Sequence, residues 1–345
     1  MSSDGFPMSA GRRSLTRMVS LMDDRMDWLL DSDPALRWQV ERDLLGLPHK
    51  AWQKTRARVA SEGFGAAILA RQDADGQWAG GAYFPSKDFD GERISVRNPQ
   101  EQPWIATTWA LKDLRELGLD ASVLDGTAEK VAENSRWEYE DLPYWGGEID
   151  VCINAFTLAN GAWLGADVSG LVAWFPEHRL ADGGWNCEAE ESDSVRSSFH
   201  STLNAVVGML AYEQLSGDES LRETRHSGEE YLLSRGLMRR LSTGEIVGPF
   251  VTDFIAPSRW QYSALAALDH FRQVSVHEGT APDPRMAEAI AAVRAARQLD
   301  GTWLQGEVPT GAVWVDIDAP QGEPSKWLTL IGTRVLDWWD AAQRG

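Results

Sequence analysis

The sequence repeats one three-part unit along its length: an amphipathic stretch, a glycine-rich loop that often ends in tryptophan, and a more apolar stretch. The loops show the repeat most clearly, because three of them read DGQW (75–78), DGGW (182–185) and DGTW (300–303). Two degenerate copies, PYWGGE (143–148) and STGEIVGPF (242–250), keep the glycines and an aromatic residue. Asp-Gly supplies a turn at positive φ, so each loop can reverse the chain and fold its tryptophan back.

Helical periodicity lies on both sides of these loops. The stretches that follow them are apolar and predict inner helices over 37–46, 104–117, 152–164, 199–213, 259–272 and 326–341. The stretches ahead of them are amphipathic and predict outer helices over 15–30, 64–72, 122–135, 167–176, 227–238 and 284–298. The alternation predicts an all-α fold, an (α/α)6 barrel or toroid of six outer and six inner helices.

An open helical solenoid is the alternative to a closed barrel. Closure is favoured because both ends of the repeat are rich in tryptophan, whereas the ends of a solenoid present a polar face.

Segments 246–251 and 312–317 predict short hairpin strands inside long loops. We expect residues 1–14 to form a disordered tail and residues 15–345 to form a single toroid domain.

Composition restricts the class of partner. The 345 residues carry 33 Lys and Arg against 52 Asp and Glu, a net charge of −19, which disfavours nucleic acid and anionic membranes. No stretch reaches the roughly 20 apolar residues of a membrane span, and we expect a cytoplasmic protein. The 17 tryptophans require a very aromatic core or a lined cavity, and the latter predicts a hydrophobic small-molecule substrate.

The starts of the predicted inner helices carry the residues that can bind such a substrate. Three of these helices begin with a basic residue followed by tryptophan, and in a barrel these starts meet at one end of the cavity. The predicted substrate-binding residues are Trp104, Trp145, Arg196, Arg259, Trp260, Tyr262 and Trp327. Each single tryptophan can also be a packing residue.

Four further residues fall near two neighbouring inner-helix starts. Asp150 can cap the helix that begins at 151–152, and Cys152 then lies in its first turn, where the helix dipole lowers a thiol pKa. His200 holds the matching position one repeat later, and Cys187 lies in the loop between them. Two thiolates, an imidazole and a carboxylate suit zinc, so the sequence predicts a zinc site; buried cysteines in a core are the alternative.

These residues resemble the terpenoid cyclase and protein prenyltransferase superfamily of α/α toroids. The DGQW, DGGW and DGTW loops are similar to the repeats of squalene and hopene cyclases. Asp150-Val-Cys152 and Phe199-His200-Ser201-Thr202 resemble the zinc-binding segments of prenyltransferase β subunits. The resemblance implies Asp150, Cys152 and His200 as zinc ligands, with Cys187 as an addition or a substitute for Asp150. It also implies a helical partner subunit, which nothing in this sequence supplies.

The resemblance leads us to expect a zinc-dependent, prenyltransferase-like or terpenoid-cyclase-like enzyme that acts on an isoprenoid-type molecule. Glu148 or Glu188, next to the metal site, would move the proton. The Asp-x-Asp-Asp acid of class II cyclases is missing, which favours a transferase. A metal-free class II-type cyclase with a nonstandard acid such as Asp253 is one alternative, and a non-catalytic toroid that binds lipid or peptide is another. We expect His49, His178, His226, His270 and His277 at surface or packing positions.

Overall fold

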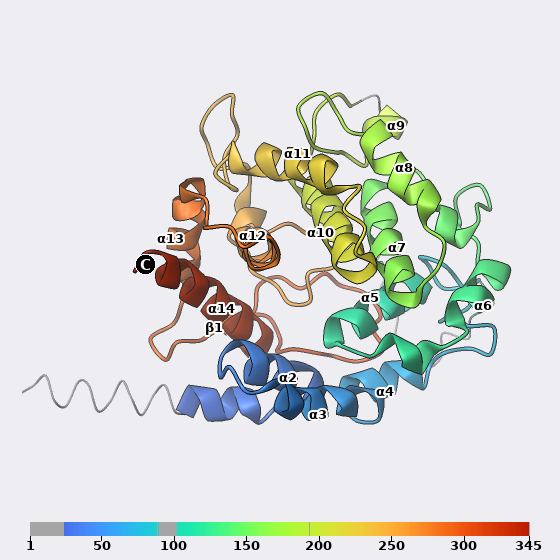
Figure 1. Cartoon of the computed structure of the whole chain (residues 1–345), viewed down its shortest axis with the longest axis horizontal. Coiled ribbons are helices and arrows are strands. Elements are labelled where there is room, and N and C mark those ends of the chain that lie inside the picture. Colours follow the sequence, from blue (N-terminus) through green and yellow to red (C-terminus); the bar gives the residue numbers. More distant parts are fainter. Residues whose placement is uncertain (1–23, 88, 90–101, 193, 345) are drawn as a thin grey trace, which may run out of the picture.

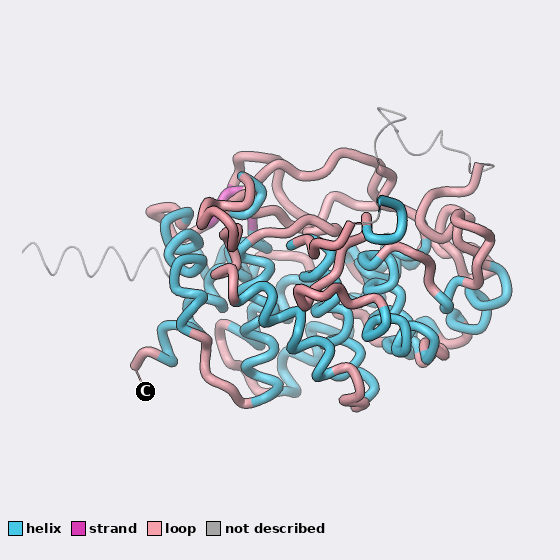
Figure 2. Tube along the Cα trace, turned by 90° about the horizontal axis from the view of Figure 1, so that it is seen from above, coloured by secondary structure: helices cyan, strands magenta, loops and turns pink. Residues whose placement is uncertain are grey.

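The computed structural model describes residues 24–87, 89, 102–192 and 194–344. The tail predicted for residues 1–14 lies outside this part of the chain. Helices dominate the described residues, which confirms the all-α class. Figure 2 shows the helical turns side by side in one layer, with the longest loops gathered along one edge. No helix within the described ranges is both long and apolar enough to cross a membrane.

Each predicted inner segment contains a helix. These inner helices are α2 (Pro34–Asp43), α5 (Thr107–Leu117), α7 (Val151–Leu164), α10 (Phe199–Ser216), α12 (Ala264–Glu278) and α14 (Lys326–Ala342). The boundaries agree within a few residues, except that α12 begins at Ala264, so the predicted start pair Arg259 and Trp260 lies in the loop before it. The N-caps of α10, α12 and α14 are serines whose side chains accept a backbone N–H, which fixes where these helices begin.

The predicted outer segments are also helical. Residues 24–30 form a helix, and the later outer helices are α4 (Gly63–Leu69), α6 (Thr127–Asn134), α8 (Ser169–Glu177), α11 (Arg222–Leu233) and α13 (Ala287–Ala296). The outer helices contact inner ones: α8 packs on α7, α11 on α10 and α13 on α12. Two helices were not predicted, α3 (His49–Ala57) and the single turn α9 (Ala189–Ser192).

The inner helices contact one another in chain order, and the last one returns to the first. α5 packs on α7, α7 on α10, α10 on α12, α12 on α14, and α14 on α2. Between α2 and α5 the contact is made by hydrogen bonds: Trp38 Nε1 donates to Leu117 O at 2.9 Å, and Gln39 Nε2 donates to Glu116 O at 3.3 Å. Figure 1 shows these helices around a common centre.

One hydrogen-bond pattern recurs in the three Asp-Gly-x-Trp loops and joins outer helix, loop and inner helix. The tryptophans are buried, and each indole Nε1 donates to a carbonyl ten residues earlier, at the end of the preceding outer helix: Trp78 to Ile68, Trp185 to Phe175 and Trp303 to Val293. Each tryptophan backbone N–H donates to a threonine hydroxyl on the following inner helix: Thr107, Thr202 and Thr329. We call this arrangement the tryptophan clamp.

The loop glycines make the clamp possible. Gly76, Gly183 and Gly301 adopt φ values of 91°, 99° and 89°, in the left-handed region predicted from the Asp-Gly pairs. Space is also restricted behind one indole, because a Cβ added at Gly228 of α11 would lie 2.7 Å from the Trp185 ring. The clamp therefore depends on glycine both for the turn and for the close approach of a neighbouring helix.

The predicted hairpin strands are wrong in position. Among the described residues, β1 (Trp303–Leu304) pairs with β2 (Pro324–Ser325) in an antiparallel register. Ile246 makes a single bridge to Arg239, and residues 312–317 form no strand. The second segment instead binds the chain ahead of α5, because Ala312 O accepts from Trp104 N and Trp314 Nε1 donates to Ile105 O.

An ion network joins α10, α11 and α12. The buried guanidinium of Arg225 donates to Glu229 at 2.6 Å and to Glu213 at 3.1 Å, and it also binds Glu278. Burial pushes the pKa of Glu213 up, but hydrogen bonds from Arg222, His277 and Arg225 outweigh burial and lower it to about 2. The folded protein therefore holds Glu213 ionised.

The clamp predicts the effect of Thr202→Val. Thr202 is fully buried and its Oγ1 accepts from Trp185 N at 3.1 Å, so valine keeps the shape and leaves a buried N–H without a partner. We expect the free energy of unfolding to fall by about 1–3 kcal/mol, measured by urea denaturation. Thr280→Val at an exposed position is the matched control and should change it little. Equal effects of the two substitutions would contradict the role of the clamp.

The ion network predicts an acid-sensitive contribution to stability. The pKa of Glu213 in the folded protein, about 2, lies below its ordinary value of about 4.3 in an unfolded chain. Its contribution is therefore complete above about pH 4.3 and is lost as the pH falls toward 2. Urea denaturation across this range should show Glu213→Gln with a flatter dependence on pH than wild type. Glu245→Gln, at an exposed position, should keep the wild-type slope.

Candidate functional site

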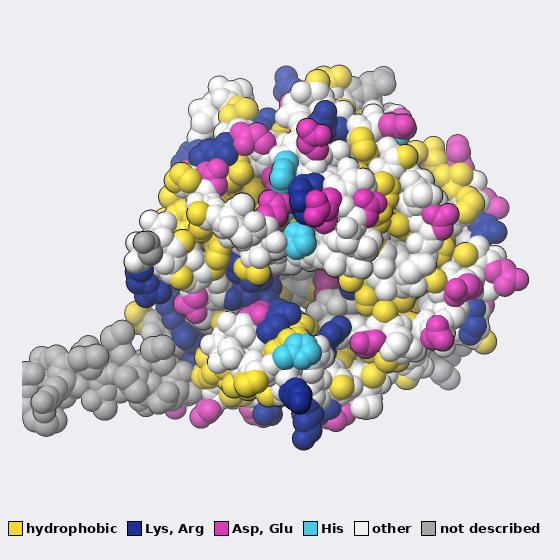
Figure 3. Space-filling view, viewed as in Figure 1, with side chains coloured by type: hydrophobic (Ala, Val, Ile, Leu, Met, Phe, Trp, Pro, Cys, Tyr) yellow, Lys and Arg dark blue, Asp and Glu magenta, His cyan; other side chains and the backbone are white. Residues whose placement is uncertain are grey.

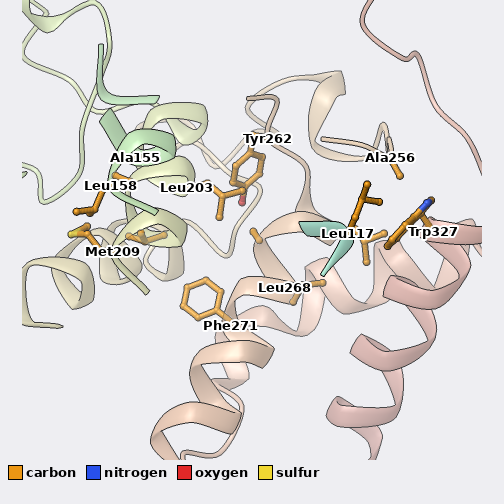
Figure 4. Close-up of a cluster of buried hydrophobic side chains, with 14 of the residues drawn as sticks. Leu117, Ala155, Leu158, Leu203, Met209, Ala256, Tyr262, Leu268, Phe271 and Trp327 are labelled. Atoms are coloured by element: carbon orange, nitrogen blue, oxygen red, sulfur yellow. The ribbon is translucent and has the colours of Figure 1, made fainter. Parts of the chain in front are cut away.

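All of the inner helices line one central cavity of about 440 Å³. Figure 3 shows the surface hollowed at the centre of the molecule, and Figure 4 shows buried side chains from α5, α10 and α14, among them Leu117, Leu203 and Trp327. The apolar part of the lining includes these three side chains together with Phe156, Ile255 and Ile331. A mostly apolar space of this size suits a hydrophobic small molecule.

The charged side chains of the lining are held in ion pairs. The basic side chains are Arg42, Lys112, Arg115, Arg259, Arg272 and Arg334, and the acidic ones are Asp113, Glu116 and Asp269. Arg334 and Arg272 bind Asp269 at 2.6 and 3.0 Å. Burial opposes ionisation of Asp269, but these two guanidinium groups outweigh it and hold its pKa well below the usual range. The cavity therefore has an apolar part and a part lined with paired charges.

The two cysteines lie in contact near the start of α7. Their Sγ atoms are 3.3 Å apart, and both are free thiols. Asn204 Nδ2 donates to Cys152 Sγ at 3.3 Å, and Ser201 Oγ donates to Cys187 Sγ at 3.3 Å. Because Asn204 also lines the central cavity, the thiol pair is separated from the cavity by one hydrogen-bonded side chain.

The pair ionises in an order that differs from the sequence prediction. The hydrogen bond with Cys187 and then burial raise the pKa of Cys152, whereas the hydrogen bond from Cys152 lowers the pKa of Cys187. The first thiolate is therefore Cys187, which is also the more exposed of the two. This order is the reverse of the one expected from the dipole of α7, because the adjacent thiol and burial oppose ionisation of Cys152.

The predicted carboxylates lie beside the thiols. Asp150 is the N-cap residue of α7, as predicted, although its side chain makes no capping hydrogen bond, and its charge acts on both thiols. Glu148 is half-buried, and burial followed by the charge of Asp150 raises its pKa to about 7. A carboxyl group with this pKa can release and accept a proton near neutral pH.

His200 is directed to other partners. Its Nδ1 accepts the backbone N–H of Tyr262 at 2.8 Å, and its ring packs 4.6 Å from Phe250 and 5.5 Å from Trp260. Burial lowers its pKa, which favours the neutral imidazole. Within the described residues, no three side chains of His, Cys, Asp or Glu are grouped to hold a metal ion. Of the predicted zinc ligands, the structure brings together the two thiols.

An aromatic cluster surrounds the thiol pair. Trp104, Trp109 and Phe156 pack with Cys152, and Tyr83 and Cys187 pack against them. The ring centroids of Trp104 and Trp109 are 4.7 Å apart, and those of Trp109 and Phe156 are 5.4 Å apart. The Arg259 guanidinium lies over Trp104 and Trp109 at 5.6 and 6.0 Å and binds Asp113 at 2.6 Å. Of the predicted substrate-binding residues in this cluster, Arg259 lines the cavity, and Trp104 packs with the thiol pair.

Other predicted substrate-binding side chains lie elsewhere. Trp145 and Tyr262 are buried and fixed by hydrogen bonds to Ala128 O and Leu237 O, so they pack helices instead of lining the cavity. Trp327 does line it, with Nε1 bound to Ile317 O. Trp260, Arg196 and Glu188 are exposed.

The predicted acid Asp253 is also outside the cavity lining. The Asp253 carboxylate accepts the backbone N–H of Glu307, and a Cβ at Gly306 would clash with this carboxylate. Asp253 therefore fixes the loop that contains Gly306 and Glu307.

Several residues of this site were not predicted. Trp109, Ser201 and Asn204 lie within one or two helical turns of Trp104 and His200, so helical spacing from the predicted residues was the available signal. Apart from Arg259, the charged lining comes from later turns of the inner helices, which carry no motif. Comparisons with protein-family models, curated proteins and solved structures find no match.

Proposed function

We propose that the inner and outer helices close into an (α/α)6 toroid, and that the chain is an enzyme of the prenyltransferase-like or terpenoid-cyclase-like kind. Its substrate would be a hydrophobic, isoprenoid-type small molecule held in the central cavity. The observation that carries this proposal is the cavity itself: every inner helix contributes to its lining, and the lining residues Phe156 and Asn204 contact the aromatic cluster and the thiol pair.

The apolar part of the cavity supports binding of a hydrocarbon chain. Phe156, Leu203, Ile255 and Trp327 come from four different segments and present apolar surface to one space. Transfer of apolar area from water contributes about 25 cal/mol per Å², so a chain enclosed here gains affinity without specific polar contacts. The faces of Trp104 and Trp109 would stabilise positive charge on a reacting carbon, as they already do for the Arg259 guanidinium.

Zinc is part of the proposal because the donor chemistry suits it. Cys152 and Cys187 would hold the ion, with Asp150 beside them, and His200 would join by exchanging its bond to Tyr262 N for the metal. Bound zinc would keep a thiolate or water ionised near neutral pH. Glu148, whose pKa lies near 7, would carry the proton. The chain's own helices line the cavity, so the proposal includes no partner subunit.

Metal analysis tests the zinc component. Elemental mass spectrometry of protein purified without chelators should find about one zinc per chain, because the two thiols lie in contact and thiolates bind zinc. Zinc should be lost in Cys152→Ala, Cys187→Ala and His200→Ala, and retained in His49→Ala, which alters an exposed histidine. A protein that binds no zinc even when zinc is supplied, or variants that all retain it, would contradict this component.

Ligand binding tests the cavity component. Equilibrium dialysis with farnesol should show saturable binding to wild type. Leu203→Trp should weaken it roughly tenfold or more, because a larger ring fills the space that the ligand needs. Val276→Trp introduces the same ring at an exposed position, where Val276 is 69% exposed, and should leave binding unchanged. Equal affinity in the two variants would show that farnesol binds outside the cavity.

A further inference from the structure

A buried imidazole of α12 pairs with a buried carboxylate of α11. His270 of α12 and Glu229 of α11 are 1% and 5% exposed, and His270 Nε2 lies 2.9 Å from Glu229 Oε1. His270 also belongs to the lining of the central cavity. The sequence analysis treated it as a packing residue, and nothing in the proposed function uses it.

The charge state of Glu229 makes Nε2 of His270 the donor in this pair. Burial pushes the pKa of Glu229 up, but His270 and Arg225 outweigh burial, so the net pKa is lowered and the carboxylate is ionised. An ionised carboxylate can only accept, so Nε2 must carry the proton that is shared with Oε1. The other ring nitrogen, Nδ1, makes no hydrogen bond to any residue in the described part of the chain.

The charged neighbours hold Glu229 in place without reaching the other ring nitrogen. Arg225 Nη1 donates to the same Oε1 at 2.6 Å, and its other bonds go to Glu213 and Glu278. Asp269, next to His270 on α12, is bound by Arg272 and Arg334. The acids around His270 therefore have partners of their own, and none of these partners binds Nδ1.

We propose that Glu229 and His270 form a hydroxyl-binding site of the central cavity, in which Nδ1 of His270 accepts a hydrogen bond from the hydroxyl of a bound apolar alcohol. Glu229 is the positioning residue of this pair. The choice of an apolar alcohol rests on the proposed function, because the apolar lining is the reason to expect a hydrophobic ligand.

Diethyl pyrocarbonate tests the site, since it acylates an imidazole nitrogen that has a free lone pair. Peptide mapping at neutral pH should find His270 acylated in the folded protein, although its side chain has almost no exposure to outside solvent. Glu229→Gln removes the charge and should slow this reaction several-fold. The matched control, Glu278→Gln, removes a carboxylate that binds Arg225 and His226 but not His270, and should leave the rate unchanged.

The outcomes separate this inference from the proposed function. His270 that reacts only after unfolding, or at the same rate in Glu229→Gln and Glu278→Gln, overturns the inference and leaves a structural ion pair. If Glu229→Gln does not fold, Glu229→Asp keeps the charge one carbon further away and should show an intermediate rate. Farnesol should protect His270. If farnesol does not bind at all, the proposed function fails, and acylation of His270 still decides whether the site exists.

Discussion

The tryptophan clamp is the interaction on which the rest of the structure depends. An indole N–H reaches back to the last turn of an outer helix, and the adjacent backbone N–H binds a threonine at the start of the next inner helix. One residue such as Trp185 thereby fixes an outer helix, a loop and an inner helix relative to each other. Both donors are buried, so breaking either leaves a polar group without a partner.

Repetition of the clamp sets the position of the cavity. The clamp joins each of these outer helices to an inner helix through the end of the outer helix. The inner helices face one another, and their side chains leave the central cavity between them. The buried charges along this space are paired, as Arg259 with Asp113 and Arg334 with Asp269, which makes a polar interior tolerable. Asn204, which binds the thiol pair, and His270, which binds Glu229, both line this cavity.

The sequence predicted the helices well because periodicity and glycine turns act locally. The hydrogen-bond partners of individual side chains were harder to predict, since these partners come from elements distant in the sequence. Trp145 belongs to a degenerate copy of the clamp loop, and its indole donates to Ala128 O on the preceding outer helix. Its position in the repeat therefore indicated a packing role more reliably than its aromatic character indicated substrate binding. His200 was predicted from its position, but the Tyr262 N–H that engages it comes from another repeat.

The central claim is that the thiol pair and the cavity form one site, connected through Asn204. The most direct measurement is the rate at which iodoacetamide alkylates Cys187 and Cys152 in chelator-treated protein, with and without saturating farnesol. Cys187 should react first, because its pKa is lowered and it is more exposed, and farnesol should slow both reactions. Unchanged rates with farnesol bound would show that the thiols and the cavity are separate.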